Sequence, residues 1–297
     1  MRSDFDRIDF HTHLFYDRPF LPGLMEEWGM RVGIINITGK KIFDESMDRR
    51  WKAMLAMKER YPERVFLCTS FDPEPIEEPG FADGVIAALE RDLDAGAVMV
   101  KVWKDIGLDV RDRSGRYVMI DDEGFRPIWD FLAKRGIPVL AHIAEPRAAW
   151  LPLDRKSPHY AYYSTHPQYH LHTMPDTPAW EELIDARDRW VERNPGLTII
   201  GAHFGSTEHD VTAVAERLDR YPNYYVDTAE RFGDLIIQDG AAVRSFFLGY
   251  HERILYATDV IWDRPAAGLT DDELAAERAS YQELLETHWN YLSGSGP

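Results

Sequence analysis

The feature that most constrains the fold of this chain is a regular alternation of short apolar segments with longer amphipathic ones. The short segments are rich in β-branched residues and have the length of strands; they cover residues 7–10, 32–37, 65–71, 97–103, 137–143, 197–203, 223–226 and 254–258. The amphipathic stretches between them include residues 46–60, 81–95, 122–135, 180–193, 210–220 and 271–290. Eight strand–helix repeats predict a parallel sheet with crossover helices, closed as a (β/α)8 TIM barrel.

The chain length agrees with one such barrel. Its 297 residues contain no linker, repeat or change of composition that would divide them. Short segments rich in proline and glycine lie where predicted helices end and strands begin. Examples are Gly136-Ile137-Pro138 and Asn194-Pro195-Gly196. We therefore expect a single α/β domain over residues 1–292 and a flexible tail over residues 293–297.

The charge and the cysteine content indicate which cellular compartment and which partners to expect. The chain has 51 acidic and 34 basic residues, a formal net charge of -17, which repels a phosphate backbone. No apolar run reaches the ~18 residues of a membrane span. The single cysteine, Cys68, lies in an apolar segment and has no partner for an internal disulfide. These features predict a cytoplasmic protein without nucleic-acid or membrane partners, although a homo-oligomer is compatible with them.

One predicted connection is much longer than the others. About 30 residues from Pro146 to Pro178 separate the fifth predicted strand from its helix, and they are rich in tyrosine and histidine. Loops of this length are usually functional or disordered, and the aromatic content argues against disorder. Because a loop that follows a barrel strand lies on the catalytic face, we expect a substrate lid here, with a packed surface loop or a subunit contact as the alternative.

Groups that bind metals or transfer protons lie at the ends of five predicted strands. His11 and His13 follow the first strand, and residues two apart on extended chain share a face. Paired imidazoles on one face suit a divalent transition metal. The remaining four are Lys101 in the fourth segment, His142 and His203 at the ends of the fifth and sixth, and Asp259 directly after the eighth. Each alone could be an ordinary buried residue, but together they predict a site at the carboxyl end of the barrel.

This ordered set resembles the amidohydrolase superfamily, and more closely its amidohydrolase-related subgroup, often called amidohydrolase family 2. The resemblance spans about residues 7–264, and the segments GIPVLAHIAEP, IGAHFGS and RILYATD are typical of the subgroup. It implies a metal-dependent enzyme. The subgroup contains hydrolases, lactonases and non-oxidative decarboxylases of the aminocarboxymuconate-semialdehyde type.

The resemblance also implies roles for individual residues. One divalent metal, in the first place Zn²⁺, would be held by four ligands, namely His11, His13, His142 and Asp259. Mn²⁺, Fe²⁺ or Co²⁺ suits the same ligands. Asp259 would also act as the general base for a water molecule bound to the metal, and His203 would orient that water or polarise the substrate.

Lys101 leaves two alternatives open. In binuclear members of the superfamily, a lysine on the fourth strand is carboxylated and bridges two metals. In mononuclear members, an unmodified lysine can be the positive partner of a substrate carboxylate. Decarboxylases of the subgroup often replace the first histidine of the His-x-His pair with glutamate, whereas this chain keeps His11.

The sequence therefore predicts a metal-dependent hydrolase that uses metal-activated water to cleave an ester, lactone or amide of a small molecule. A non-oxidative decarboxylase on the same scaffold is the alternative, and a catalytically idle barrel that only binds a partner is a third. Arginines follow several predicted strands, and their guanidinium groups suit a substrate carboxylate. The predicted substrate contacts are Glu145, Arg147, His170 and Arg111.

Overall fold

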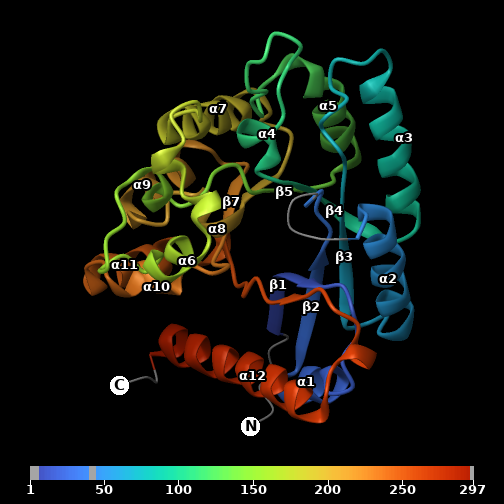
Figure 1. Cartoon of the computed structure of the whole chain (residues 1–297), viewed down its shortest axis with the longest axis vertical. Helices are drawn as coiled ribbons and strands as arrows, with labels where there is room; N and C mark the ends of the chain where they lie inside the picture. The colour runs from blue at the N-terminus through green and yellow to red at the C-terminus, as the bar shows by residue number, and fades with distance from the viewer. Residues whose placement is uncertain (1–6, 40–44, 295–297) are drawn as a thin grey trace.

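The computed structural model describes residues 7–39 and 45–294, which form one curled parallel sheet surrounded by helices (Figure 1). In the described part of the chain this sheet has nine strands in the order β8-β7-β6-β5-β4-β3-β2-β1-β9. The strands are β1 (Arg7–Leu14), β2 (Met30–Ile35), β3 (Val65–Ser70), β4 (Ala97–Val102), β5 (Val139–Ala141), β6 (Ile199–Gly201), β7 (Tyr224–Asp227), β8 (Ile254–Leu255) and β9 (Ile261–Trp262). The predicted TIM-barrel architecture is confirmed.

The barrel closes where the last strands meet the first. β9 pairs in parallel with the end of β1. Between β8 and β9, the backbone N–H of Phe10 donates to Tyr256 O at 2.9 Å, and the N–H of Asp259 donates to His11 O at 2.8 Å. β8 covers only the first two residues of the eighth predicted strand, 254–258, and a ninth strand, β9, follows the turn at Asp259, whose φ is +65°.

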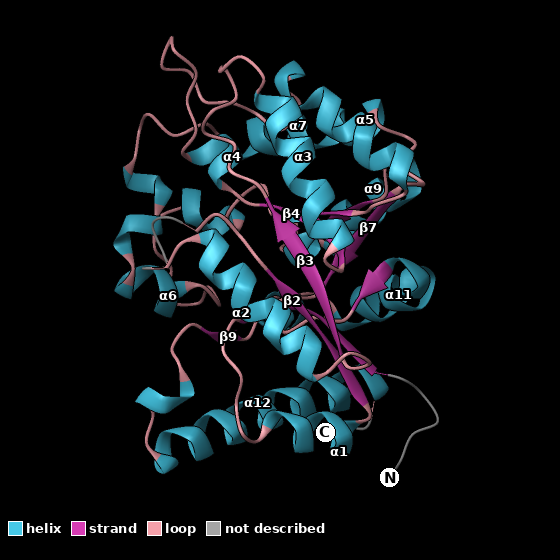
Figure 2. Cartoon of the chain, turned by 90° about the vertical axis from the view of Figure 1, so that its right-hand side faces the viewer, coloured by secondary structure: helices cyan, strands magenta, loops and turns pink. Residues whose placement is uncertain are grey.

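Helices cover the outside of the sheet in the expected alternation (Figures 1 and 2). They are α1 (Leu21–Trp28), α2 (Met47–Arg60), α3 (Phe81–Asp94), α4 (Asp105–Leu108), α5 (Arg126–Arg135), α6 (Tyr160–Thr165), α7 (Trp180–Arg193), α8 (Ala202–Gly205), α9 (Val211–Arg220), α10 (Phe232–Ile236), α11 (Gly240–Tyr250) and α12 (Asp271–Ser293). The helix ends follow local chemistry, since the Thr270 hydroxyl accepts from Glu273 N, and Gly136 ends α5 with a φ of +65°.

The two terminal helices, α1 and α12, lie together at one end of the molecule (Figures 1 and 2). Leu21 and Leu24 of α1 and Leu285 of α12 belong to one buried cluster with residues of β1 and β2. Burial of these side chains closes the end of the barrel where the strands begin. Of the expected tail, Ser293 is the last residue of α12, Gly294 caps the helix, and residues 295–297 lie outside the described residues.

The long connection between β5 and α7 is ordered by its own short helices. It contains three short 3₁₀ turns and α6, and the indole of Trp150 donates to Pro178 O at 2.9 Å across its two ends. Tyr163 of α6 is buried. No helix in the described part of the chain has both the length and the apolarity needed to cross a bilayer.

Candidate metal centre and its cavity

Three of the predicted ligands meet at the carboxyl end of the barrel. His11 and His13 project from β1, and Asp259 lies in the turn between β8 and β9. The Nε2 atoms of His11 and His13 lie 3.4 Å and 3.3 Å from Asp259 Oδ1. His203, at the end of β6, places its Nε2 3.9 Å from Asp259 Oδ2. One ligand atom from each of His11, His13 and Asp259 lies within 4.8 Å of the other two, which is compatible with a shared metal ion.

The other ring nitrogen of each of these histidines faces a hydrogen-bond acceptor. The Nδ1 distances are 2.8 Å for His11 to Asp227 Oδ2, 2.7 Å for His13 to Ile35 O and 2.8 Å for His203 to Ala229 O. These acceptors hold the proton on Nδ1 and turn the Nε2 lone pairs toward the centre of the site. Such outer acceptors are the usual way in which proteins orient metal-ligating histidines.

This arrangement fits a divalent cation. The Nε2 lone pairs of His11 and His13 face the carboxylate of Asp259. All of these atoms are hydrogen-bond acceptors, so none of them supplies a proton to the others. Asp259 Oδ1 and His142 Nε2 are buried and have no hydrogen-bond partner. Buried polar atoms of this kind require a partner, and a cation between His11, His13 and Asp259 would supply one for Asp259 Oδ1.

Electrostatics keep the ligands in the forms that bind metals. Burial, reinforced by the charge of Lys101, lowers the pKa of His11, and burial lowers the pKa of His142 and His203 well below the ordinary value. Burial alone would raise the pKa of Asp259, but the imidazoles hold it well below the ordinary value. Neutral imidazoles and an ionised carboxylate are therefore favoured.

Lys101 projects from β4 into the same cluster. Its ammonium is buried, and its Nζ lies 3.2 Å from His11 Nε2. Burial lowers the pKa of Lys101 to about 8. This position is compatible with both predicted roles, a carboxylated bridge between two metals and an unmodified cation beside the site.

His142 lies against His203 rather than against Asp259. The centroids of the two rings are 4.3 Å apart. His142 is not part of the compact group of His11, His13 and Asp259, so its role as a ligand stays a prediction.

Backbone strain is concentrated around this centre. The described non-glycine residues with positive φ are His203, Phe204, Ser206, Glu230 and Asp259, with values between 54° and 65°. Left-handed backbone costs a side-chain-bearing residue roughly 1–2 kcal/mol, and strained residues of this kind cluster at functional sites. In the turn at residues 203–206, the N–H of His203 donates to Asp227 Oδ1 at 2.7 Å, which helps to fix the histidine.

A cavity of about 470 Å³ opens over the metal centre. Its volume lies within the ~300–1,000 Å³ typical of sites for small molecules. His142, His203 and Asp259 line it beside the candidate metal site, and Lys104 and Arg231 line it together with Glu230 and Asp234. Further lining comes from Glu145, Tyr162, Tyr163 and the start of α6 at His159. The long β5–α7 connection therefore contributes to the cavity, as the lid prediction requires.

The sequence matches the amidohydrolase family model over residues 8–287. The chain belongs to this family. No curated protein matches the sequence. The family membership predicted from the histidine, lysine and aspartate pattern is confirmed.

Solved structures with the same fold include two decarboxylases. The 2,6-dihydroxybenzoate decarboxylase from Rhizobium is 18% identical with a TM-score of 0.52, over 92% of this chain and 90% of that one. A dihydroxybenzoic acid decarboxylase from Polaromonas, with bound manganese and 2-nitroresorcinol, is 15% identical with a TM-score of 0.51, over 92% and 89% of the two chains. An uncharacterised TIM-barrel protein from Bordetella bronchiseptica is 17% identical with a TM-score of 0.52, over 86% and 85%. At these identities the similarity shows the fold of this amidohydrolase-family protein, not its reaction.

Of the four predicted substrate contacts, only Glu145 lines the cavity, where it pairs with Lys104. The other three are held elsewhere by local contacts. Arg147 is exposed, with its guanidinium 5.7 Å from the ring centre of Trp180, and Arg111 is exposed over the ring of Tyr117 at 3.7 Å. His170 is buried and places its Nε2 2.8 Å from Leu151 O. These three positions strengthen loops and do not reach the lining of the cavity.

Asp227 is one of the residues at this site that the sequence did not single out. It directly follows the predicted strand 223–226, just as Asp259 directly follows the strand predicted at 254–258. The same signal at the carboxyl end of a strand was therefore present. Burial opposes ionisation of Asp227, but its electrostatic interaction and its hydrogen bond with His11 lower the pKa of Asp227 below the ordinary value.

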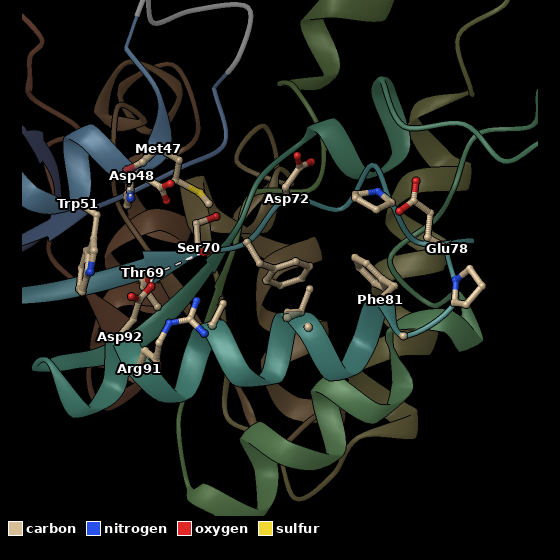
Figure 3. Close-up of a pocket in the computed structure, with 18 residues that line it drawn as sticks. Met47, Asp48, Trp51, Thr69, Ser70, Asp72, Glu78, Phe81, Arg91 and Asp92 are labelled. Carbon is tan, nitrogen blue, oxygen red and sulfur yellow. Dashed lines mark hydrogen bonds between the residues drawn. The ribbon is translucent and has the colours of Figure 1, made fainter.

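A second cavity, of about 370 Å³, lies outside the barrel between α2 and α3 (Figure 3). Its carboxylates include Asp48, Asp72 and Asp92, and the hydroxyl of Thr69 donates to Asp92. Among the described residues that line it, none is a histidine. The described lining of this cavity therefore lacks the imidazoles that His11 and His13 offer at the barrel mouth.

Proposed function

We propose that this amidohydrolase-family protein is a metal-dependent, non-oxidative decarboxylase of a small hydroxylated aromatic carboxylate. One observation carries the proposal. A single cavity of about 470 Å³ combines Asp259 of the candidate metal site, the side chains of Lys104 and Arg231, and two tyrosines from the long connection. A planar, anionic substrate needs all three features, namely a metal for its oxygens, positive charge for its carboxylate and aromatic surface for its ring.

The names of the solved structures support this choice over hydrolysis. Two of the proteins with this fold are decarboxylases of dihydroxybenzoates, and one of them was determined with manganese and 2-nitroresorcinol. Mn²⁺ suits the same imidazole and carboxylate ligands as Zn²⁺, so we propose either metal as the cofactor.

The metal would be held by His11, His13 and Asp259. When bound, it supplies positive charge that polarises the oxygen substituents of the substrate. Arg231, buried and lining the cavity, has an unpartnered Nε that can donate to a substrate oxygen. Tyr162 and Tyr163 pack edge to face at 5.3 Å and provide the ring-binding surface. Closure of the lid segment over this cavity excludes water.

Asp259 is suited to move the proton that decarboxylation requires. Its ionised carboxylate accepts the proton of a hydroxyl next to the substrate carboxylate and returns it to the ring carbon that carries this carboxylate. The bond from that carbon to the carboxylate then breaks, its electron pair returns to the ring, and CO₂ leaves. The products are the phenolate and CO₂, so no oxidant and no water are consumed.

The test is to incubate the full chain, loaded with Mn²⁺, with 2,6-dihydroxybenzoate in D₂O and to measure CO₂ and the isotopic content of the resorcinol formed. We expect CO₂ release and one deuterium at the vacated ring carbon, after subtraction of the exchange seen with resorcinol alone. No CO₂ from this compound or from a panel of other ortho-hydroxybenzoates would contradict the proposal.

A matched pair of arginine variants tests the cavity. Arg231→Met removes a charged donor from the cavity wall, and we expect kcat/KM to fall about ten- to a hundredfold, since hydrogen bonds to charged groups contribute roughly 1.5–3 kcal/mol. Arg220→Met, which removes an exposed arginine of α9, should leave kcat/KM unchanged. Equal effects in the two variants would place the substrate elsewhere.

Hydrolysis of a small ester, lactone or amide is the second candidate, and one observation favours it. The chain keeps His11, where decarboxylases of the subgroup often have glutamate, and Lys101 lies 3.2 Å from its Nε2. In water enriched in oxygen-18, a hydrolase labels the acid product, whereas a decarboxylase leaves its organic product unlabelled.

A further inference from the structure

A second group of potential metal ligands lies at the edge of the cavity, away from His11 and His13. His159 immediately precedes α6, Glu208 lies between α8 and α9, and Asp234 is on α10. One ligand atom from each lies within 4.8 Å of the others. His159 Nε2 is 2.9 Å from Asp234 Oδ1.

Both carboxylates are buried and incompletely partnered. Glu208 is 1% exposed and Asp234 is 4% exposed. Glu208 Oε2 and Asp234 Oδ2 have no hydrogen-bond partner. Two orphaned carboxylate oxygens in one buried cluster require a compensating ligand, because an unpaired buried charge costs several kcal/mol.

The nearby positive charge does not balance the cluster. Arg231 is buried and interacts electrostatically with Glu208 and Asp234. Its guanidinium, however, donates a hydrogen bond to Glu230 O at 2.9 Å. Among the described residues, no ion pair within 4.0 Å joins Arg231 to either carboxylate. The formal charges of two carboxylates and one guanidinium leave the cluster with a net negative charge.

The donor set identifies the class of ligand. One imidazole nitrogen and two carboxylates suit first-row divalent metals such as Zn²⁺ or Mn²⁺, whereas Ca²⁺ and Mg²⁺ prefer oxygen ligands alone. We propose that His159, Glu208 and Asp234 form a second divalent-metal site that shares no residue with the centre at His11, His13 and Asp259. This inference does not depend on which reaction the protein catalyses.

A metal at this site would join three separate connections of the barrel. His159 lies in the β5–α7 connection, Glu208 follows β6, and Asp234 follows β7. The ion would fasten the lid segment to the wall of the cavity, next to Tyr162 and Tyr163. Its role is thus structural, and it holds the lid in the position in which it lines the cavity.

Native mass spectrometry of the full chain, loaded with Mn²⁺ after chelation, tests the site by counting ions. We expect Glu208→Gln and Asp234→Asn each to bind one Mn²⁺ fewer than the unaltered chain. His166→Ala, which removes an exposed histidine from the same connection, should bind as many ions as the unaltered chain. Unchanged Mn²⁺ counts in both carboxylate variants would overturn the proposal.

Limited proteolysis gives a second readout that is separate from the catalytic centre. In a His13→Ala background, Mn²⁺ should slow cleavage within residues 151–178 at least about tenfold, because a ligand that binds only the closed form suppresses opening. Adding Glu208→Gln should abolish this protection. Equal protection with and without Glu208→Gln would also overturn the proposal, and circular dichroism would verify that each variant is folded.

Discussion

Two aspartates at the junction of the first and last strands have opposite surroundings. Asp9 is fully buried and accepts hydrogen bonds from Thr258 N at 3.0 Å, Thr258 Oγ1 at 2.6 Å and Tyr281 Oη at 2.7 Å. Asp259 lies one residue beyond Thr258, faces the cavity, and leaves Oδ1 without a partner among three imidazoles. A carboxylate with a complete set of donors supports the fold, whereas one without is free to bind a ligand.

The pKa values of the two residues show the same contrast. Burial raises the pKa of Asp9 to about 7, although its three donors oppose the shift. Burial also acts on Asp259, but there the imidazoles prevail and hold the pKa well below the ordinary value. The Asp9 region is therefore built for stability and the Asp259 region for ionic chemistry, and the following predictions probe that division.

The largest effect is expected at Asp259. Asp259→Asn removes the charge of the proposed metal ligand and proton carrier, so kcat should fall by about a thousandfold or more, since a bound metal supplies several kcal/mol of transition-state stabilisation. The unfolding midpoint of the metal-free protein in urea should not decrease, because no hydrogen bond to Oδ1 is lost. A metal-free variant that unfolds much more easily would assign Asp259 to the fold instead.

The next effect concerns the left-handed turn that presents His203. At Gly205, with a φ of +63°, an added Cβ would lie 2.0 Å from the Tyr224 hydroxyl. Gly205→Ala should therefore lower the free energy of unfolding by about 3 kcal/mol. Gly23→Ala is the matched control, because nothing lies within 4 Å of that Cβ in α1, and it should stabilise by about 0.5–1 kcal/mol. Urea unfolding measures both changes, and similar values would contradict the proposed strain.

Asp227 should behave as a positioning residue. Asp227→Asn keeps the shape but weakens the acceptor of His11 Nδ1, so metal affinity should fall about ten- to a hundredfold. Competition with a chelator measures the affinity, and Asp227→Glu tests whether a displaced carboxylate restores part of it. An unchanged metal affinity in Asp227→Asn would show that His11 is not a ligand.

Asp9 should give the protein a pH-dependent stability. Because its pKa is about 7 in the folded state and 3.8 ordinarily, its contribution is fully present below pH 3.8 and is lost as the pH rises through 7. Asp9→Asn mimics the protonated form and should remove this loss, which is on the order of 2 kcal/mol between pH 5 and pH 8. Urea unfolding at the two pH values measures it. Parallel pH profiles for the variant and the unaltered chain would contradict this assignment.

The smallest effect is expected from the Tyr281 hydroxyl. Tyr281→Phe deletes one of the three donors to Asp9, so the free energy of unfolding should fall by about 1 kcal/mol. The proposed decarboxylase activity at saturating substrate should not change, because Tyr281 belongs to the support between β1 and α12. A large loss of kcat would show that the Asp9 region also contributes to catalysis.

Much of the fold and part of the site could be predicted from the sequence. The alternation of apolar and amphipathic segments predicts the barrel, because these patterns reflect local burial. The His11–His13 spacing and the strand-end position of Asp259 likewise depend on strand geometry alone. Lys101 and His203 were placed near the centre by the same reasoning.

The remainder depends on contacts between distant segments. The turn at His203 requires left-handed backbone that its own sequence disfavours, and contacts with Asp227 and Ala229 fix it. The directions of loop side chains are also difficult to predict from the sequence. Arg147, for example, points toward Trp180, which lies far along the chain. The sequence favours hydrolysis because the chain keeps His11, whereas the cavity combines side chains from separate connections of the barrel, which no local pattern predicts.

The most direct test of the account is anomalous diffraction from crystals grown with Mn²⁺. The account predicts a manganese peak bound by His11 Nε2, His13 Nε2 and the carboxylate of Asp259, at about 2.0–2.3 Å as for other ions with these ligands. A fully ordered barrel mouth with no manganese among these three residues would contradict the central claim.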